Sequence, residues 1–239
     1  MILKYVKTND GSISAYNDKY DDYYHSQKDG AILETLYKHI IPSFSIVDKT
    51  SLKILDICFG LGYNSLFTLA YAKKFNINVE IFSPEKDILL LDGLRNFKYP
   101  KILYNYLDIN NILHSITQSK KYNQSNLSLY VFKGDASIYL QQFKDGFFDI
   151  IYQDAFSPSK NNELWSESHF RELYRILHND GVITTYSSSS FVRKNAFLCG
   201  FFVFNMKYFK LKQGSIFTKQ DIDIKNIENI ILNKIDRLN

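Results

Sequence analysis

The chain is poor in the residues that mark special architectures. Its 239 residues include 10 Gly, 4 Pro, 2 Cys and 1 Trp, although 16% of the side chains are aromatic. So few Gly and Pro with so many aromatic residues exclude collagen-like and disordered chains. Two thiols, Cys58 and Cys199, cannot form a disulfide framework. Both lie in apolar segments, so we expect them to be buried in a reduced protein.

Signals for membranes, secretion and metals are also absent. No apolar run approaches the roughly 20 residues that a membrane-spanning helix needs. Residues 1–5 lack the apolar stretch and the cleavage site of a signal peptide, so we expect a cytoplasmic protein without membrane contact. His25 and His169 have no metal-ligand spacing with a Cys or a second His, and we therefore predict no metal.

The charge balance is mild and does not identify a partner. The formal net charge is +4, from 29 Lys and Arg against 25 Asp and Glu. A nucleic-acid partner is allowed by this balance, but a local basic cluster would have to supply the attraction.

Hydrophobic residues make up 45% of the chain and follow alternating strand and helix patterns. Short apolar runs predict strands at 53–58, 78–83, 127–132, 147–153 and 181–186, with a terminal antiparallel pair at 201–204 and 215–217. Helical spacing predicts helices at 30–41, 64–75, 86–96, 137–143, 163–177 and 191–198, and Pro42 is expected to end the first of these. This alternation predicts an α/β, Rossmann-like fold, with a mainly parallel, seven-stranded sheet and helices on both faces.

No repeat, low-complexity tract or linker divides the chain, so its parts are distinguished by pattern alone. Residues 1–45 are expected to form an N-terminal irregular and helical element that packs on the core, with irregular structure or a short hairpin within 1–26. Residues 46–219 form the α/β domain, and 220–239 form a C-terminal helical tail. Residues 98–126 are polar and predict a helix before a loop.

Ligands of such sheets bind beyond the carboxyl ends of the strands, so the residues that follow each strand are informative. Gly60 and Gly62 follow the first strand, where they allow a tight turn and close approach of a ligand. A plain strand-to-helix turn also needs small residues, and the third Gly of the NAD fingerprint is missing. Glu85 follows the second strand, where a carboxylate can bind a ribose diol. Its alternative role is to stabilise a helix N-terminus.

Two further carboxylates follow the next strands. Asp135 could accept a hydrogen bond from an adenine amino group, or cap the helix behind it, or do both. Asp154 precedes a long loop that contains Pro158, where the reactive end of a ligand should lie, although it could also be a turn-forming Asp. In order, the four signals describe a site for S-adenosylmethionine, with the glycines at its amino-acid part, Glu85 on ribose, Asp135 on adenine and Asp154 near the sulfonium methyl.

These residues resemble the methyltransferase domain of the MnmC family, which modifies the wobble uridine of certain tRNAs. The resemblance covers roughly residues 20–219. Its first motifs are an opening element at 22–26, 29–30 and 34–35 and a Phe-Gly-x-Gly-x-Asn turn at 59–64. A signature follows at 154–165. The last motif is a Ser-x-x-Phe-Val-Arg element at 188–193, which precedes a Gly-Phe turn at 200–201. Asp56 stands where the family often has Glu. Asn162 replaces a signature Pro, a change that affects substrate specificity more than cofactor binding.

The resemblance implies the fold of a class I S-adenosylmethionine-dependent methyltransferase and assigns roles to individual residues. Asp154 would be catalytic. The cofactor would be bound by Asp56, Phe59, Gly60, Gly62, Asn64, Glu85, Asp135 and Ala136. The substrate would be bound by Tyr24, Phe156, Pro158, Lys160, Trp165 and Arg193.

The implied reaction is methyl transfer to the amine of 5-aminomethyluridine, or of its 2-thio form, in the anticodon stem-loop of tRNA. The product is the 5-methylaminomethyl nucleoside. Asp154 would orient the amine and accept its hydrogen bond, so positioning would supply most of the rate. Without the flavin-dependent oxidase domain fused in many members, the chain resembles the stand-alone methyltransferases, and separate enzymes would supply the precursor.

Aromatic and basic residues complete the expected site. Tyr24, Phe156 and Trp165 are candidates for stacking on a flipped-out uridine, against the alternative of core packing. Candidates for phosphate contacts, against the alternative of a solvated basic face, are Lys160, Arg193, Lys194, Lys207, Lys210 and Lys212.

Three other functions remain open. An aminopropyltransferase would use the same sheet and an Asp after the fourth strand, but the glycine turn at 59–64 lacks the consecutive glycines of that class. A methyltransferase of a free small molecule would not require tRNA. A catalytically silent RNA-binding protein would have no use for a carboxylate such as Asp154 beside a methyl donor.

Overall fold

The computed structural model describes residues 4–206, 213–225 and 227–229. Its strands are β1 (Lys4–Lys7), β2 (Ile13–Asn17), β3 (Asp22–Tyr23), β4 (Ser51–Ile57), β5 (Asn78–Glu85), β6 (Lys121–Gln124), β7 (Leu127–Lys133), β8 (Phe148–Gln153), β9 (Leu177–Thr185), β10 (Phe202–Met206) and β11 (Gly214–Thr218). Its helices are α1 (Ala31–Glu34), η1 (Thr35–Ile40), α2 (Ile41–Ile46), α3 (Tyr63–Phe75), α4 (Ile88–Gly93), η2 (Leu94–Asn96), α5 (Lys101–Tyr104), α6 (Ile109–Ser119), α7 (Ala136–Leu140), η3 (Asn162–Trp165), α8 (Glu167–Ile176) and α9 (Ser190–Leu198).

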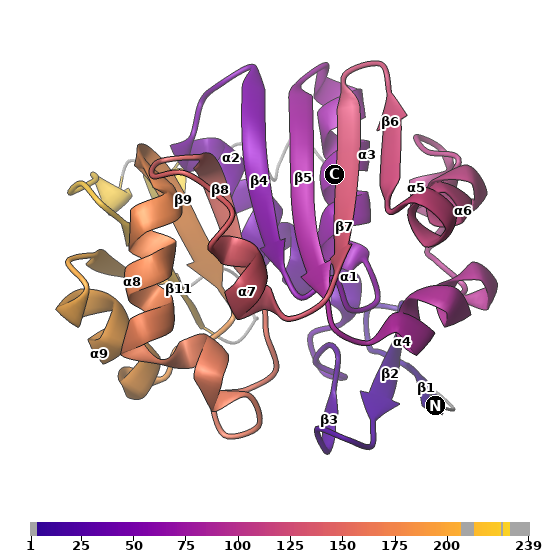
Figure 1. Cartoon of the computed structure of the whole chain (residues 1–239), viewed down its shortest axis with the longest axis horizontal. Coiled ribbons are helices and arrows are strands. Elements are labelled where there is room, and N and C mark those ends of the chain that lie inside the picture. The colour runs from indigo at the N-terminus through magenta and orange to yellow at the C-terminus, as the bar shows by residue number, and fades with distance from the viewer. Residues whose placement is uncertain (1–3, 207–212, 226, 230–239) are drawn as a thin grey trace.

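A twisted sheet with the strand order β10-β11-β9-β8-β4-β5-β7-β6 forms the centre of the molecule (Figure 1). The five strands β9, β8, β4, β5 and β7 are parallel, while β11 and β10 continue the sheet in antiparallel pairs. After β7 the chain returns to the other side of β4, so the topological switch point lies between β4 and β8. The α/β, Rossmann-like fold and the terminal antiparallel pair are confirmed.

The expected number of strands, seven, is too low by one. Among the described residues the sheet has eight strands, because β6 pairs antiparallel with β7 and forms an additional edge strand. Ser125, in the left-handed region at φ 53°, lies in the turn between them. The Lys-Tyr-Asn-Gln sequence of β6 is polar except for Tyr122, whose side chain is buried. The strand therefore carries almost no hydrophobic signal. Residues 98–126, where a helix before a loop was predicted, contain α5, α6 and β6.

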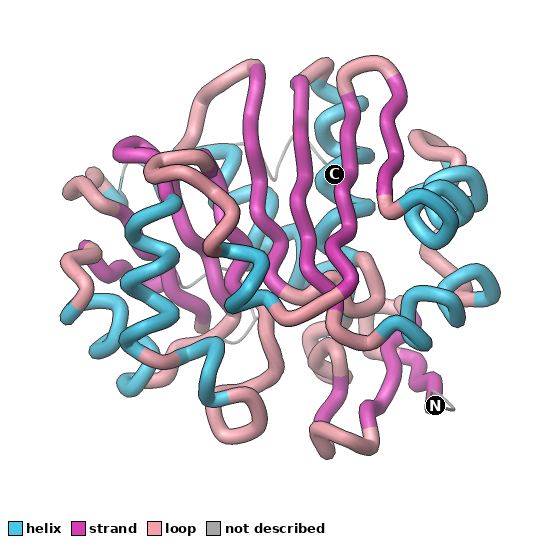
Figure 2. The backbone as a smooth tube through the Cα atoms, in the orientation of Figure 1, coloured by secondary structure: helices cyan, strands magenta, loops and turns pink. Residues whose placement is uncertain are grey.

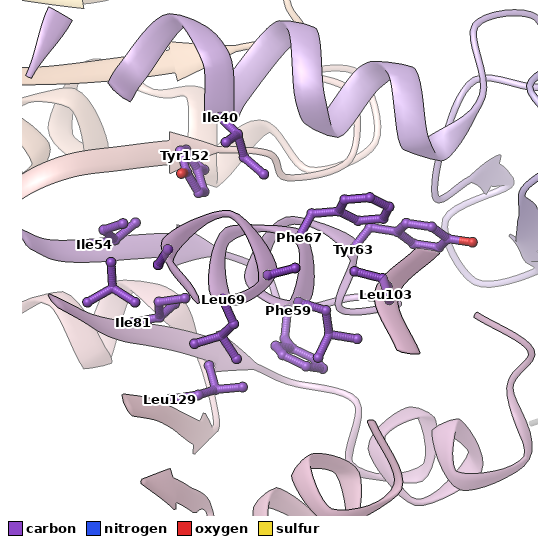
Figure 3. Packing of buried hydrophobic residues seen from close by; sticks show 14 of the residues in the cluster. Ile40, Ile54, Phe59, Tyr63, Phe67, Leu69, Ile81, Leu103, Leu129 and Tyr152 are labelled. Carbon is purple, nitrogen blue, oxygen red and sulfur yellow. The ribbon is translucent and has the colours of Figure 1, made fainter. Parts of the chain in front are cut away.

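Alternate residues of each parallel strand pack on opposite faces of the sheet. On one face, Ile54, Ile81 and Leu129 from three adjacent strands lie beside Leu69 of α3 (Figure 3). That face is also covered by α1, α2 and α6, whereas α7, α8 and α9 cover the other face around residues such as Leu55. Both faces are thus buried under helices, as predicted.

The first helical segment does not end at Pro42. It continues through α1, η1 and α2 to Ile46. The middle part, η1, is a π-helix, in which the N–H of Ile41 donates to the carbonyl of Leu36. Pro42 then occupies one of the first positions of α2, where its missing N–H is tolerated. The expectation of a stop at Pro42 was wrong because the widened turn begins a new helix at the proline.

The N-terminal strands form a separate antiparallel sheet, β1-β2-β3. In Figure 1 the arrowheads of β4, β5 and β7 point toward this small sheet, so it lies beyond the carboxyl ends of the parallel strands. At the other end of the chain, residues 224–225 and 227–229 are helical, and the rest of the expected tail, 230–239, lies outside the described residues. None of the described helices is long and apolar enough to cross a membrane.

Candidate active site

A cavity of about 1070 Å³ opens between the carboxyl ends of the strands and the N-terminal segment 17–28. Figure 2 shows the loops that connect strands to helices along this edge. The cavity is lined by the loops that follow β4, β5, β7 and β8, and by residues of the N-terminal sheet and α1. It therefore lies where the topology predicts a ligand.

The turn after β4 has a backbone conformation that requires its glycines. Gly60 and Gly62 have φ of 54° and 78°, in the left-handed region that favours glycine. A Cβ at Gly62 would lie 2.8 Å from the Phe59 ring, and one at Gly60 would lie 3.3 Å from Tyr24. Phe59 and Gly60 line the cavity, whereas Gly62 only shapes the turn.

Cys58 precedes this turn and also lines the cavity, with a φ of 70°. Burial raises the pKa of its thiol well above the ordinary value. Both Cys58 and Cys199 are free and half-buried rather than fully buried. The cavity accounts for the exposure of Cys58, because its strand end faces open space instead of the core.

Glu85 closes the same corner of the cavity. Its carboxylate accepts hydrogen bonds from the backbone N–H of Gly60 (2.8 Å) and of Asp87 (2.7 Å). Burial raises its pKa above the ordinary value despite these two donors. The alternative placed Glu85 at the N-terminus of a helix. In the structure it is instead the last residue of β5.

Asp135 and Ala136 line the cavity after β7. Asp135 accepts a hydrogen bond from the backbone N–H of Ser137 (2.9 Å), which confirms the helix cap expected for α7. Its second oxygen lies 2.8 Å from Lys86 Nζ. The hydrogen bond from Lys86 lowers the pKa of the Asp135 carboxyl, so this carboxylate is ionised at the cavity wall.

Asp154 follows β8 and reaches into the cavity with 17% of its side chain exposed. Asn64 Nδ2 donates to its Oδ2 (2.7 Å), and His39 Nε2 lies 3.5 Å from its Oδ1. Burial alone would raise the pKa of Asp154, but His39, His25 and Asn64 together outweigh burial and hold it below its ordinary value. The cavity thus contains an ionised carboxylate that is oriented on both oxygens.

Asn64 lies at the cavity floor, and Asp56 lies below it. Asp56 is fully buried and does not line the cavity. It accepts hydrogen bonds from Ser65 Oγ (2.6 Å) and Asn64 Nδ2 (3.4 Å), and burial raises its pKa to about 7. Asn64, which does line the cavity, therefore joins two carboxylates. Direct cofactor contact through Asp56, as the resemblance implied, does not fit this position.

Aromatic side chains form the wall opposite the sheet. The Phe156 ring stacks on Tyr20 with centroids 4.5 Å apart and contacts Tyr24 at 5.1 Å, and all three line the cavity. Trp165 does not belong to this wall. It is 0% exposed in the core, where its Nε1 donates to the carbonyl of Phe156 (2.7 Å). Stacking of Trp165 on a substrate does not fit this structure, and its contact braces the Phe156 loop.

The expected basic residues lie mostly away from the cavity. Arg193 donates to Ser215 Oγ (2.9 Å) and to the carbonyl of Gly214 (3.2 Å), and neither it nor Pro158 lines the cavity. Lys160 forms an ion pair with Asp21 (2.9 Å) outside the lining. Lys194 is exposed on α9. Lys207, Lys210 and Lys212 lie outside the described residues.

Comparison with known proteins identifies the family. Residues 100–220, which include the Asp135 and Asp154 loops, match the family of S-adenosyl-L-methionine-dependent methyltransferases. The chain belongs to this family. Its cofactor is therefore S-adenosyl-L-methionine, and the aminopropyltransferase alternative is not supported.

The methyltransferase is similar to MNMC2 of Aquifex aeolicus, whose crystal structure matches with a TM-score of 0.80 and 30% identity over 96% of this chain and 76% of that one. It is 30% identical over 209 residues to an uncharacterized protein of Methanocaldococcus jannaschii, covering 87% of this chain and 57% of that protein. It is also 32% identical over 173 residues to the Campylobacter hominis tRNA 5-methylaminomethyl-2-thiouridine biosynthesis bifunctional protein MnmC, covering 68% and 25%. The resemblance to MnmC is thus confirmed. The matched region spans little more than half the length of the Methanocaldococcus jannaschii protein and a quarter of the length of the Campylobacter hominis protein.

The residues of this methyltransferase fit its cofactor. Gly60 lines the cavity, where a Cβ would lie 3.3 Å from Tyr24, and the same cavity is bordered by the carboxylates of Glu85, Asp135 and Asp154. A positively charged sulfonium compound suits such a lining. Among the described residues, no group of three His, Cys, Asp or Glu side chains is placed to hold a metal ion.

Several residues of the site carry no clear sequence signal. Glu34, Lys38 and His25 line the cavity from the N-terminal side. Lys38 is buried between Glu34 (2.9 Å) and Asp29 (3.2 Å). His39 lies behind Asp154. His25 and Glu34 belonged to the opening motif but had no role assigned, and Lys38 and His39 belonged to no motif, since polar positions in a helical pattern do not reveal which distant strand end they face.

The cavity mouth also carries cations that the sequence did not single out. Lys19, Lys28 and Lys86 are exposed and line it. Lys86 pairs with Asp135, while Lys19 lies 5.5 Å from the centre of the Tyr20 ring. These three lysines are called the rim lysines below, and the same lining also contains the acidic residues Asp22, Asp87 and Glu163.

Proposed function

We propose that this methyltransferase methylates the primary amine of 5-aminomethyluridine, or of its 2-thio form, in the anticodon stem-loop of tRNA. The product would be the 5-methylaminomethyl nucleoside. The observation that carries the proposal is Asp154, an ionised carboxylate in the cavity, oriented by Asn64 and His39 next to the Phe156 ring. The name of the Campylobacter hominis relative supports the choice of nucleoside.

The charge of the acceptor explains why a carboxylate is needed. A primary alkylamine is mostly protonated near neutral pH, and an ammonium ion has no lone pair for attack. Asp154 would attract this cation, accept a hydrogen bond from it, relay one proton to water and orient the neutral nitrogen. S-adenosyl-L-methionine supplies an activated methyl group, so no covalent enzyme intermediate is required. Holding two reactants in line then provides most of the acceleration.

We further propose that the cofactor is held by the lining residues that face it from the strand ends. Phe59 and Gly60 would contact its amino-acid part with Asn64, while Glu85 would accept from the ribose hydroxyls. Asp135 and Ala136 would lie at the adenine. Gly62 and Asp56 would act indirectly, by shaping the turn and by fixing Asn64 and Ser65.

For the nucleoside, we propose contacts with the aromatic wall. Phe156 and Tyr24, joined by Tyr20, would hold the base of a flipped-out uridine by stacking. The lysines of the rim, Lys19, Lys28 and Lys86, would contact phosphates together with Lys160, whose partner Asp21 is exposed. Such a reaction would take place in the cytoplasm, on tRNA that already carries the aminomethyl group.

The test is a methylation assay on tRNA from cells that lack this activity, with radiolabelled S-adenosyl-L-methionine and nucleoside analysis after digestion. We expect label in the 5-methylaminomethyl nucleoside, and none when tRNA is omitted or already carries that group. Cofactor binding without labelled nucleoside would contradict the proposal and favour a free small amine as the substrate.

A further inference from the structure

The π-helical turn η1 faces Asp154 from behind the cavity. Its His39 is 1% exposed, and the two ring nitrogens point to two different strands. Nε2 lies 3.5 Å from Asp154 Oδ1, after β8, and Nδ1 lies 3.0 Å from Thr184 Oγ1, on β9. The ring is therefore held between both partners, and its orientation is fixed without contact to the cavity.

The same turn also controls the second oxygen of Asp154. Thr35 Oγ1 donates to Asn64 Oδ1 (3.0 Å), which fixes the amide so that Asn64 Nδ2 points to Asp154 Oδ2 (2.7 Å). Thr35 and His39 are four residues apart and lie on the same side of the turn. One helical turn thus reaches both carboxylate oxygens, once directly and once through an amide. Widened π-turns often occur at functional sites.

We propose that His39 and Thr35 are positioning residues that fix the charge and orientation of Asp154 toward the acceptor amine. Neither residue lines the cavity, so each acts on the substrate only through Asp154. The nature of the acceptor rests on the proposed function. The organisation of Asp154 does not, because it follows from contacts within the chain.

Simple packing does not explain this arrangement. An ionised carboxylate in a largely buried position is costly unless donors face it. Without His39, Asp154 would keep the hydrogen bond from Asn64, which also donates to the second carboxylate, Asp56, and the electrostatic interaction with His25. His39 is thus the donor that Asp154 does not share with another acid.

Other titratable groups surround Asp154 and bear on its protonation. Burial lowers the pKa of His25, which favours its neutral form even though Asp154 and Glu34 oppose that shift. The titratable groups that interact electrostatically with Asp154 are His39, His25, Asp56, Cys58 and Tyr186, while Glu34 acts on His25 and Tyr186. Of these, only the two histidines can stabilise its negative charge.

The test compares variants that remove a donor with variants that keep one. His39→Leu and Thr35→Val remove the hydrogen-bonding atoms, whereas His39→Gln and Thr35→Ser retain a donor. We expect His39→Leu to lower turnover roughly ten-fold or more near pH 6 and only a few-fold near pH 8.5, because its Asp154 becomes protonated at the lower pH. His39→Gln and Thr35→Ser should recover most of the activity. The KM for S-adenosyl-L-methionine should change less than about three-fold.

His169→Leu is a matched control, because this buried imidazole contacts Gln153 and not Asp154. Any loss that it causes should be the same at both pH values. If His39→Leu also lost activity by one constant factor, or if His39→Gln were as impaired as His39→Leu, the positioning role would be wrong.

A second measurement does not depend on catalysis. The Asp154 carboxyl is followed by carbon NMR during a pH titration of isotope-labelled protein, and its midpoint should move upward in His39→Leu but not in His169→Leu. An unchanged midpoint would overturn the inference. If the wild-type protein methylated no tRNA while the midpoint moved as expected, the proposed function would fail and the positioning role would stand.

Discussion

At the scale of single residues, Asp154 has the most demanding position in the chain. Its burial favours the neutral acid, yet Asn64 and His39 approach both oxygens and keep it ionised. Replacement by Asn keeps the shape and removes the charge. It also places an amide N–H group opposite Asn64 or His39, the two side chains that face the oxygens of Asp154. Such a change separates the role of the charge from that of packing.

We expect Asp154→Asn to reduce methyl transfer by about 100-fold or more, since orientation and charge are both lost. Binding of S-adenosylhomocysteine should stay within about three-fold of wild type, because the other carboxylates of the cavity remain. Single-turnover methylation and calorimetric titration measure the two effects. Asp145→Asn, which alters an exposed acid paired with Arg175, is the control. Full turnover by Asp154→Asn would contradict the catalytic assignment.

The residue types that follow each strand were enough to predict much of the site. Gly60, Glu85, Asp135 and Asp154 all line the cavity, because parallel strands bring their carboxyl ends to one edge. Trp165 was misplaced, since an aromatic residue in a motif looks the same whether it faces substrate or core. Roles for buried polar residues such as His39 were not predictable, because their partners are distant in sequence and appear only when the helix packs.

At the scale of elements, the segment between β2 and β3 closes the cavity against the β8 loop. Tyr20 stacks on Phe156, and Asp21 pairs with Lys160 of the same loop. These contacts join the N-terminal sheet to the signature loop across the proposed nucleoside site. The N-terminal segment is therefore part of the cavity wall and not only a cover for the core.

We expect Tyr20→Ala to lower kcat/KM for tRNA roughly three- to ten-fold, because a stacked aromatic pair contributes about 0.5–1.5 kcal/mol beyond its buried area. Affinity for S-adenosylhomocysteine should change less. Steady-state kinetics with tRNA and calorimetry with the product measure these effects. Tyr5→Ala, on β1, removes an exposed ring that contacts Phe97 outside the cavity lining and should leave kcat/KM unchanged. Equal effects of both variants would exclude a specific role for the segment.

The elements themselves were predictable in proportion to their hydrophobic signal. Each parallel strand contains several buried apolar residues, and each was found with its ends within a few positions. The strand β6 was missed because only Tyr122 is apolar, and the helix through Pro42 was cut short because a π-turn cannot be recognised from residue types. Both errors concern local geometry, and neither changed the layers of the fold.

At the scale of the whole molecule, Asp56 links the site to the free energy of unfolding. It lies fully buried under the cavity floor and holds Ser65 and Asn64 in place. Burial raises its pKa from 3.8 to about 7 in the folded protein. The folded state thus binds a proton that the unfolded chain releases above about pH 4. The carboxyl that organises the site must therefore destabilise the fold as it ionises.

We predict the sign of this effect from linkage. Because the folded pKa lies above the unfolded one, the contribution of Asp56 to the free energy of unfolding falls as pH rises from about 4 to about 7, by an amount on the order of a few kcal/mol, and is constant above that range. Asp56→Asn has no such proton. Urea unfolding of both proteins between about pH 4 and pH 8 should therefore show wild type losing stability relative to Asp56→Asn as pH rises, while Asp145→Asn, altered at an exposed acid, runs parallel to wild type. A difference that stayed flat or grew in favour of wild type would mean that Asn64 and Ser65 already hold Asp56 ionised, and that the charge beneath the cavity is part of the resting site.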